Sequence, residues 1–198
     1  MSVIFLAGIN NSVKGHWQRR WFRRLGGWWV EHADWARPNA SDWVADLKRA
    51  LGKVKGPRLL LCHSMGCLLA AEWARLHGDP GVAGAFLVGV PDVKADAYPK
   101  EAEGFGSPFG VRLPFPAMVV ASRNDPYAGM EYSRRLAAHW GARLADVGEK
   151  GHINLNSGLG LWDEGLELLK GFLGSLPARH PETHGKARPV LPGFSGQG

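Results

Sequence analysis

Residues 58–77 read RLLLCHSMGCLLAAEWARLH, an apolar run that passes almost directly into an apolar helical pattern. The run Arg58–Cys62 is continuous rather than alternating, which is typical of a strand buried on both faces of a sheet. In the stretch Met65–His77, apolar residues occur almost all round the predicted helix, so we expect it to be buried on more than one side. Because His63 and Ser64 alone separate the two, the stretch predicts a tight strand–turn–helix inside an α/β fold.

The rest of the chain repeats this alternation of short apolar runs and helical patterns. Strong strand candidates are Val3–Ala7, Ala85–Val90 and Ala117–Ala121, and weaker ones are Trp29–Ala33 and Arg143–Val147. Amphipathic helices are predicted near residues 16–25, 42–51, 129–140 and 162–173, the second with Ser41 as its N-cap. This order predicts a three-layer α/β sandwich, with a mostly parallel sheet of about six strands and helices on both faces.

The length of 198 residues fits a single domain, which we expect to span residues 1–176. Residues 92–114 form a long connection, which is either a small apolar flap or a surface loop with its own small core. Its large apolar residues are Tyr98, Phe105, Phe109 and Leu113. Residues 177–198 are rich in Pro, Gly and polar residues, and they predict a flexible C-terminal tail.

Several features predict a cytoplasmic protein. No stretch approaches the roughly 18 consecutive apolar residues that a membrane span needs. The first residues, MSVIFLAG, have no basic segment and too short an apolar run for a signal peptide. Cys62 and Cys67 have neither metal-ligand nor redox spacing, so we expect free thiols, which suit a reducing compartment.

Nucleic-acid, metal and cofactor binding are not favoured. The net charge of +6 is moderate. In the first predicted helix, four Arg side chains fall on the arc opposite the apolar ones; the two sets are Arg19, Arg20, Arg23, Arg24 and Trp17, Trp21, Phe22, Leu25. Aromatic rings that face the core cannot stack on bases, so a solvated basic face is favoured. His180 and His184 lack a Cys pair upstream, and no Gly-rich phosphate loop leads into a helix.

Ser64 lies in the turn between the predicted strand and helix, which is the position of a nucleophile elbow. Such a turn strains the backbone at the serine and lifts its hydroxyl above the sheet edge, while Gly66 lets the helix pack close to the strand. The usual pattern is G-x-S-x-G, and here Cys62 replaces the first Gly. The alternative is that Ser64 merely caps a core helix.

Two further residues suit the chemistry of an activated serine. A serine hydroxyl becomes a good nucleophile when a base removes its proton, and that base needs an acid to orient it. Asp125 follows the predicted strand Ala117–Ala121, and His152 follows a weaker strand. With Ser64 they fall at the carboxyl ends of parallel strands, where open α/β sheets place their sites. Asp92 also follows a strand and is the rival acid.

Two backbone N–H groups must hold the oxyanion that such a reaction forms. We expect one from Met65, directly after the nucleophile, and the other from Ile9 or Asn10 in the loop after the first strand. Residues that we expect to line a substrate pocket are His16, Trp17, Tyr127 and Asn154. Trp17 also suits a place in the core.

Several pieces of the sequence resemble the RBBP9/YdeN family of small serine hydrolases, within the α/β-hydrolase superfamily. These pieces are His16-Trp17-Gln18, His63-Ser64-Met65-Gly66, Ser122-Arg123-Asn124-Asp125-Pro126-Tyr127, and Gly151-His152-Ile153-Asn154 with Ser157-Gly158-Leu159-Gly160 and Trp162…Gly165. The resemblance implies a minimal α/β-hydrolase sheet, hydrolysis of carboxylic esters, and a triad of Ser64, Asp125 and His152. Cys62 departs from the family's pattern.

The sequence therefore predicts a serine hydrolase that cleaves esters with small or short acyl groups through an acyl-enzyme, with no cofactor. The alternative is a binding or interaction protein that keeps the fold and has weak or lost activity. The presence of all three triad residue types favours the enzyme, whereas Cys62 in the elbow favours the alternative.

Overall fold

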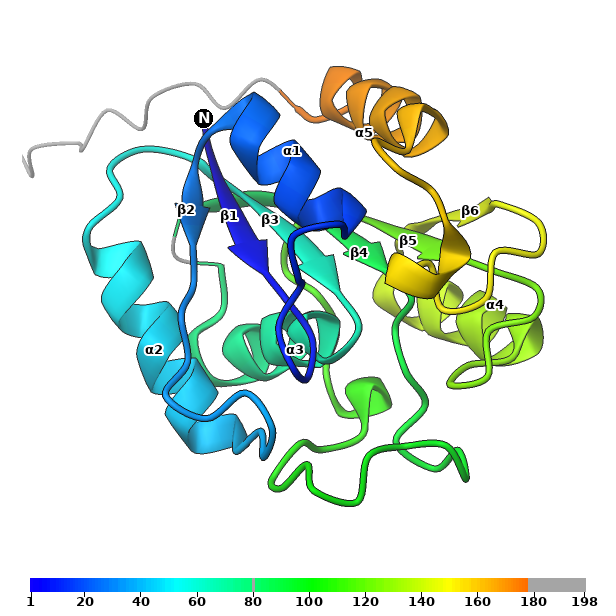
Figure 1. Ribbon diagram of the computed structural model, residues 1–198. Coiled ribbons are helices and arrows are strands. Elements are labelled where there is room, and N and C mark those ends of the chain that lie inside the picture. Colours follow the sequence, from blue (N-terminus) through cyan, green and yellow to red (C-terminus); the bar gives the residue numbers. More distant parts are fainter. Residues whose placement is uncertain (80, 178–198) are drawn as a thin grey trace, which may run out of the picture.

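The computed structural model describes residues 1–79 and 81–177, which form a six-stranded parallel sheet with helices on both faces (Figure 1). The strand order is β2-β1-β3-β4-β5-β6. The strands are β1 (Ser2–Leu6), β2 (Trp28–Trp29), β3 (Arg58–His63), β4 (Val82–Val88), β5 (Ala117–Ala121) and β6 (Arg143–Asp146). The helices are α1 (Trp17–Leu25), α2 (Ala40–Gly52), α3 (Met65–His77), α4 (Met130–Trp140) and α5 (Asp163–Gly174), with short 3₁₀ turns η1 (Pro108–Gly110) and η2 (Leu155–Ser157). The predicted three-layer α/β sandwich is confirmed.

Alternate residues of the central strands face two separate hydrophobic cores. One core lies between the sheet and α2, α3 and α4, and it contains Leu60 and Cys62 of β3. The other lies between the sheet and α1 and α5, and it contains Leu59 and Leu61. Because helices cover both faces, every residue of β4 and β5 is buried, which explains the continuous apolar runs in the sequence.

The bounds of the central strands are partly as predicted. The strand at Ala117–Ala121 is confirmed. The strand predicted at Ala85–Val90 is displaced, since β4 already pairs with Arg58 of β3 at Val82. It ends before Gly89, whose φ of 61° leaves the extended conformation.

The first two strands also differ from their predictions. β1 begins and ends one residue earlier than the predicted Val3–Ala7. Of the weak candidate Trp29–Ala33 only Trp29 is strand, because β2 consists of Trp28 and Trp29, which pair with Ile4 and Phe5 of β1. The remainder of that candidate lies outside the ladder, so it is loop rather than strand.

The helix predicted at Met65–His77 is confirmed, whereas α2 begins earlier than predicted. Asn39 and not Ser41 is its N-cap, because the Asn39 side-chain oxygen accepts the N–H groups of Ser41 and Asp42 at 3.0 and 3.4 Å. The helix therefore starts at Ala40.

Helix α1 buries Trp17 and Trp21 as its pattern predicts. Leu25, placed on the same arc, is 43% exposed, so that part of the prediction is wrong. It is the last residue of the helix, where the chain turns away from the core at Gly26. The guanidinium of Arg19 lies 3.7 Å from the centre of a Trp29 ring, a cation–π contact at the edge of the basic face.

The connection 92–114 packs on the core that includes α2, α3 and α4. Gly106 N–H donates to a carboxylate oxygen of buried Glu72 at 2.9 Å, and the Trp140 indole N–H donates to the carbonyl of Pro108 at 3.0 Å. The side chains that pack against this core are Tyr98, Phe105, Phe109 and Leu113. Within this connection Pro99 alone lines the cavity at Ser64. The large apolar side chains of the connection therefore pack on the main core and not in a small core of their own.

The predicted tail 177–198 lies outside the described residues, apart from Pro177. His180 and His184 lie in the same part of the chain. Within the described residues, no helix combines the length and apolar character that crossing a membrane would require.

Candidate active site

Ser64 occupies the turn between β3 and α3 with φ 55° and ψ −125°, a conformation that non-glycine residues rarely adopt. Its N–H donates to the carbonyl of Val88 at 3.0 Å, which ties the turn to β4. Two glycines make room for it. A Cβ on Gly66 would overlap the carbonyl oxygen of Leu6, and a Cβ on Gly8 would lie 2.7 Å from the Ser64 Cβ. The local sequence thus forms a strained strand–turn–helix, which is the backbone geometry that a nucleophile elbow requires.

Cys62, which replaces the first Gly of the usual elbow motif, lies in β3, two residues before Ser64. Its side chain is fully buried in the core on the α3 side of the sheet, in register between Leu6 of β1 and Leu87 of β4. Burial raises the pKa of the Cys62 thiol well above its ordinary value. It is therefore a protonated core residue and a poor nucleophile.

The loop that carries His152 is tied to the loop that carries Asp125. Gly151 N–H donates to the side-chain oxygen of Asn124 at 2.7 Å, and Lys150 N–H donates to the Ser122 hydroxyl at 2.8 Å. These contacts set the separation of base and acid. Sequence reasoning did not assign a role to Asn124 or Ser122, although both stand directly between a buried strand and the predicted acid.

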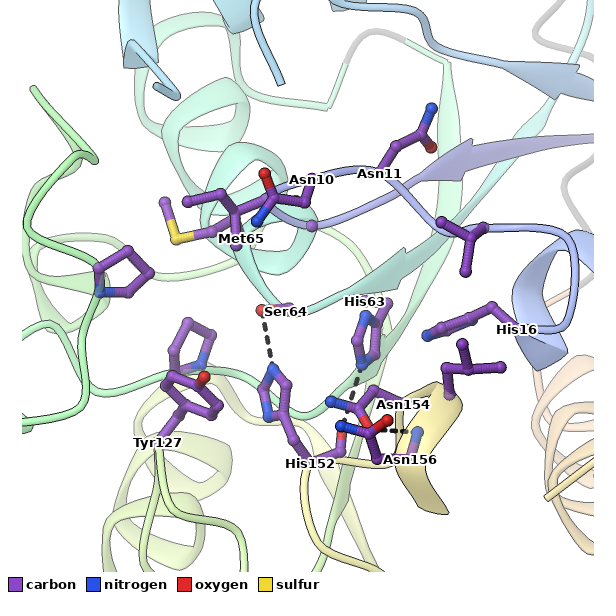
Figure 2. A pocket seen from close by; sticks show the side chains of 16 residues that line it. Asn10, Asn11, His16, His63, Ser64, Met65, Tyr127, His152, Asn154 and Asn156 are labelled. Atoms are coloured by element: carbon purple, nitrogen blue, oxygen red, sulfur yellow. Dashed lines mark hydrogen bonds between the residues drawn. The ribbon is translucent and has the colours of Figure 1, made fainter. Parts of the chain in front are cut away.

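Ser64, His152 and Asp125 form a continuous hydrogen-bonded row, part of which is drawn in Figure 2. His152 Nε2 lies 2.8 Å from Ser64 Oγ, and Nδ1 lies 3.0 and 2.9 Å from the two carboxylate oxygens of Asp125. Because a carboxylate accepts and cannot donate, Nδ1 carries the proton and the Nε2 lone pair faces the serine hydroxyl. The side chains of His152 and Asp125 are 8% and 2% exposed, so water screens this pair weakly.

Asp92, the rival acid, is engaged elsewhere. Its side-chain oxygen accepts the N–H of Lys94 at 2.9 Å. Asp125, in contrast, also accepts the N–H of Tyr127 at 2.9 Å, which fixes the carboxylate as it faces His152. The geometry therefore favours Asp125.

Two further histidines lie near His152: His63, which precedes Ser64, and His16, which the sequence predicts to line the pocket. His63 Nε2 lies 3.0 Å from the carbonyl oxygen of His152 and donates to it, which ties the nucleophile's neighbour to the base's backbone. The His63 ring lies 4.8 Å from that of His16 and 5.0 Å from that of His152. Burial, followed by repulsion from neighbouring histidines, lowers the pKa of His63 well below its ordinary value and that of His16 to about 4. Both rings are neutral near pH 7.

The backbone above Ser64 offers two N–H groups. Met65 is the first residue of α3, so its N–H has no acceptor inside the helix, and the helix N-terminus favours negative charge. Among the described residues the N–H of Ile9 also makes no hydrogen bond. The alternative with Asn10 does not fit, because its N–H donates to the carbonyl of Trp35 at 2.8 Å.

A cavity of about 240 Å³ opens at Ser64 and His152. Of the residues predicted to line a pocket, His16, Tyr127 and Asn154 do so. Trp17 does not: its indole N–H donates to the carbonyl of Ile153 at 2.7 Å inside the core. Within residues 1–79 and 81–177, no cluster of three or more His, Cys, Asp or Glu side chains is placed to hold a metal ion.

Comparisons with known proteins show the family of this chain. The family model described as serine hydrolase matches residues 3–171. A YdeN-like hydrolase from Pectobacterium atrosepticum is 30% identical, with 89% of this chain and 92% of that chain covered, at a TM-score of 0.77.

Two more distant structures share the fold. The ydeN gene product of Bacillus subtilis is 18% identical, with 88% and 99% of the two chains covered, at a TM-score of 0.69. An esterase from Rhodococcus sp. is 13% identical, with 89% and 91% covered, at a TM-score of 0.67. A search of curated protein sequences finds no match. The predicted resemblance to RBBP9/YdeN-type small serine hydrolases is confirmed, and the chain belongs to the serine hydrolase family.

Proposed function

We propose that this protein is a carboxylesterase that cleaves small or short-chain esters through an acyl-enzyme on Ser64. One observation carries the proposal: Ser64, His152 and the Asp125 carboxylate form one hydrogen-bonded row, of which Ser64 and His152 line a cavity. This is the arrangement that activates a serine hydroxyl at neutral pH.

In the first step Ser64 Oγ attacks the ester carbonyl carbon while His152 Nε2 takes the hydroxyl proton. Asp125, bonded to Nδ1–H, stabilises the imidazolium that forms. The N–H groups of Met65 and Ile9 hold the oxyanion of the tetrahedral intermediate. When the C–O bond breaks, His152 returns the proton to the leaving alcohol, and the acyl group stays on Ser64.

In the second step water repeats the attack on the acyl-enzyme. His152 accepts a proton from the water, the oxyanion forms again, and collapse releases the carboxylic acid and restores the Ser64 hydroxyl. The reaction needs no cofactor. A similar fold in solved esterases, such as that from Rhodococcus sp., supports an ester substrate for this chain as well.

A fluorophosphonate probe tests the proposal, because it labels activated serine hydroxyls. The protein and its Ser64→Ala variant are treated in parallel, and the labelled peptide is mapped by mass spectrometry. We expect labelling at Ser64 in the first and none in the second. Equal labelling of both proteins, no labelling, or labelling at Cys62 or Cys67 would contradict it.

We also propose that the protein acts in the cytoplasm. Both cysteines of the chain are buried free thiols, a state that reducing compartments maintain. Fractionation of cells that express the chain tests this: we expect it among the cytoplasmic proteins, and recovery from the periplasm, medium or membranes would contradict the assignment.

A further inference from the structure

The cavity at Ser64 has no charged wall, although the chain carries 24 Lys and Arg and 18 Asp and Glu residues. None of the 16 residues that line it is Lys, Arg, Asp or Glu. His16 and His63, which do line it, are neutral at pH 7. A charged group of a substrate would lose its water here without meeting a counter-charge, which is unfavourable.

Charged residues near the site lie outside this lining. Glu149 and Lys150 border a second hollow, which adjoins the cavity and shares Tyr127, His152, Asn154 and Asn156 with it. The Lys150 ammonium lies 3.3 Å from the Glu164 carboxylate, so its charge is already paired. Neither Glu149 nor Lys150 lines the cavity itself.

Ser64 lies between two halves of the cavity that differ in chemistry. Figure 2 shows Met65 and Tyr127 on one side of Ser64 and His16, Asn154 and Asn156 on the other. We call the first the apolar half, formed by Met65, Pro91 and Tyr127, and the second the amide half, formed by His16, Asn154, Leu155 and Asn156. Asn10 also lines the cavity, and Figure 2 shows its side-chain amide above Ser64, outside the amide half. Asp92, which follows Pro91, donates its N–H to the carbonyl of Tyr127. Pro91 therefore lies near Tyr127 and belongs to the apolar half.

The amide half offers hydrogen-bonding groups that the protein itself leaves unused. The side-chain oxygen of Asn154 accepts the N–H of Asn156 at 3.0 Å, which fixes the orientation of the Asn154 amide and leaves its NH₂ as a donor. The same oxygen also caps the N–H of Ser157, and among the described residues no hydrogen bond engages the NH₂ of Asn154 or the side-chain amide of Asn156. Both residues follow His152 on the same loop, so they lie beside the base.

We propose that this site selects small uncharged esters, with a hydroxyl-, carbonyl- or amide-bearing arm in the amide half and a short apolar arm in the apolar half. The proposal rests on the esterase function proposed above, because the two arms are the substituents of the carbonyl carbon bound to Ser64. The volume of about 240 Å³ lies below the roughly 300–1,000 Å³ of pockets for drug-sized ligands, which agrees with small substrates.

Two sets of nearly isosteric esters test the proposal. The acyl set varies the acid and consists of four methyl esters, those of glycolate, propionate, glycine and the malonate monoanion. The alcohol set varies the alcohol and consists of the acetate esters of 2-hydroxyethanol, propanol, choline and the glycolate anion. Each kcat/KM is divided by the hydroxide-catalysed rate of the same ester. In one set we expect this corrected kcat/KM to be about 3- to 10-fold higher for the hydroxyl ester than for its apolar isostere. In both sets we expect the corrected kcat/KM of the charged esters to be at least about 10-fold lower than that of the better neutral ester.

Fluorophosphonate labelling of Ser64 in the same preparation separates the two claims. If Ser64 is labelled but a charged ester is fastest, or the apolar isostere matches the hydroxyl ester in both sets, this proposal fails and the esterase stands. If Ser64 is not labelled and no ester is cleaved, the proposed function itself fails.

Substitutions of the two cavity asparagines provide a second test, which compares ratios between esters and so does not depend on overall activity. Asn154→Asp keeps the oxygen that caps η2 and adds a negative charge, so we expect the preference for cationic over anionic esters to rise about 10-fold. Asn156→Leu should lower the preference for the hydroxyl ester about 3- to 10-fold. Ser41→Asp, at the exposed start of α2, should change neither ratio. Unchanged ratios in both cavity variants would overturn the proposal.

Discussion

Two histidine–aspartate pairs lie in the described part of the chain, and they differ in what the second ring nitrogen meets. His152 Nδ1 lies 2.9 Å from Asp125, and its Nε2 faces Ser64 at the cavity. His32 Nδ1 lies 2.7 Å from Asp46, but its ring stacks on Trp43 with the centres 4.0 Å apart and the planes 2° from parallel.

The difference lies in the surroundings rather than in the pair itself. The His32 side chain is 0% exposed, and its Nε2 is buried with no partner among the described residues. Burial lowers the pKa of His32 in spite of the neighbouring Asp46 carboxylate. The pair at His32 therefore holds packing together, whereas the pair at His152 becomes chemically useful because a strained turn delivers a hydroxyl to its free nitrogen.

The largest effect should follow from removing the hydroxyl or the base. Ser64→Ala and His152→Ala are each expected to lower kcat roughly 10⁵- to 10⁶-fold, because each removes the whole nucleophilic step. The double variant should lose little more than either single one, since the two residues act as a unit. Ester hydrolysis by the three purified proteins measures this. Multiplied losses in the double variant would show that the two residues act independently.

The same substitution should affect different properties at the two aspartates, kcat at Asp125 and stability at Asp46. Asp125→Asn should lower kcat roughly 10⁴-fold, because the amide no longer holds the right tautomer of His152. Asp46→Asn should leave kcat within about 2-fold and lower the free energy of unfolding by about 1–3 kcal/mol, as it weakens a buried hydrogen bond. Kinetics and urea unfolding of both variants check this. A large loss of kcat in Asp46→Asn would break the comparison.

The space around Ser64 is the next expected determinant of activity. A Cβ on Gly8 would lie 2.7 Å from the Ser64 Cβ and 3.2 Å from its Oγ. Gly8→Ala should therefore displace the hydroxyl and lower kcat about 10- to 100-fold, because small misplacements of reacting atoms are costly. Gly129→Ala is the matched control, since its Cβ would meet nothing within 4 Å at a φ of −62°. Equal kcat in both variants would show that the hydroxyl tolerates crowding.

The fold, and the proximity of Ser64, His152 and Asp125, could be predicted because their signals are local and chemical. Buried strands produce apolar runs, and the carboxyl ends of parallel strands gather Ser64, Asp125 and His152 whatever the details of the loops. The boundary errors arose where pairing overrides composition, as at Val82, or where a side chain two residues away supplies the cap, as at Asn39.

What could not be predicted depends on contacts between distant segments. The N–H of Asn10 donates to the carbonyl of Trp35, and this hydrogen bond leaves the N–H of Ile9, and not that of Asn10, available for an oxyanion. The contact of His63 with the backbone of His152 spans 89 positions of the chain. Likewise, no local pattern distinguishes the loop packed by Glu72 from a flap. Tertiary hydrogen bonds of this kind leave no periodic trace in the sequence.

The smallest predicted effect concerns protonation of the buried histidines that lie outside the triad. His16 has a pKa of about 4 in the folded protein against an ordinary 6.5, because burial and then His152 disfavour its charge. Between these values the folded state binds fewer protons than the unfolded one, so stability is full above pH 6.5 and falls as the pH drops toward 4. At pH 5 the loss from His16 should be about 2 kcal/mol.

Urea unfolding at pH 7.5 and pH 5.0 measures this loss, and His16→Asn isolates it. Asn can still accept the N–H of Gln18 as the N-cap of α1, as His16 Nδ1 does at 3.1 Å, but it does not titrate. The variant should therefore lose less stability than the parent protein between the two pH values, by about 2 kcal/mol. His32→Asn, in the closed pair, should flatten the pH dependence in the same direction and leave kcat unchanged, because its ring never faces the cavity. If the free energy of unfolding depends equally on pH in the parent protein and both variants, these rings titrate normally in the folded state. The contrast between the two histidine–aspartate pairs would then lie in geometry alone.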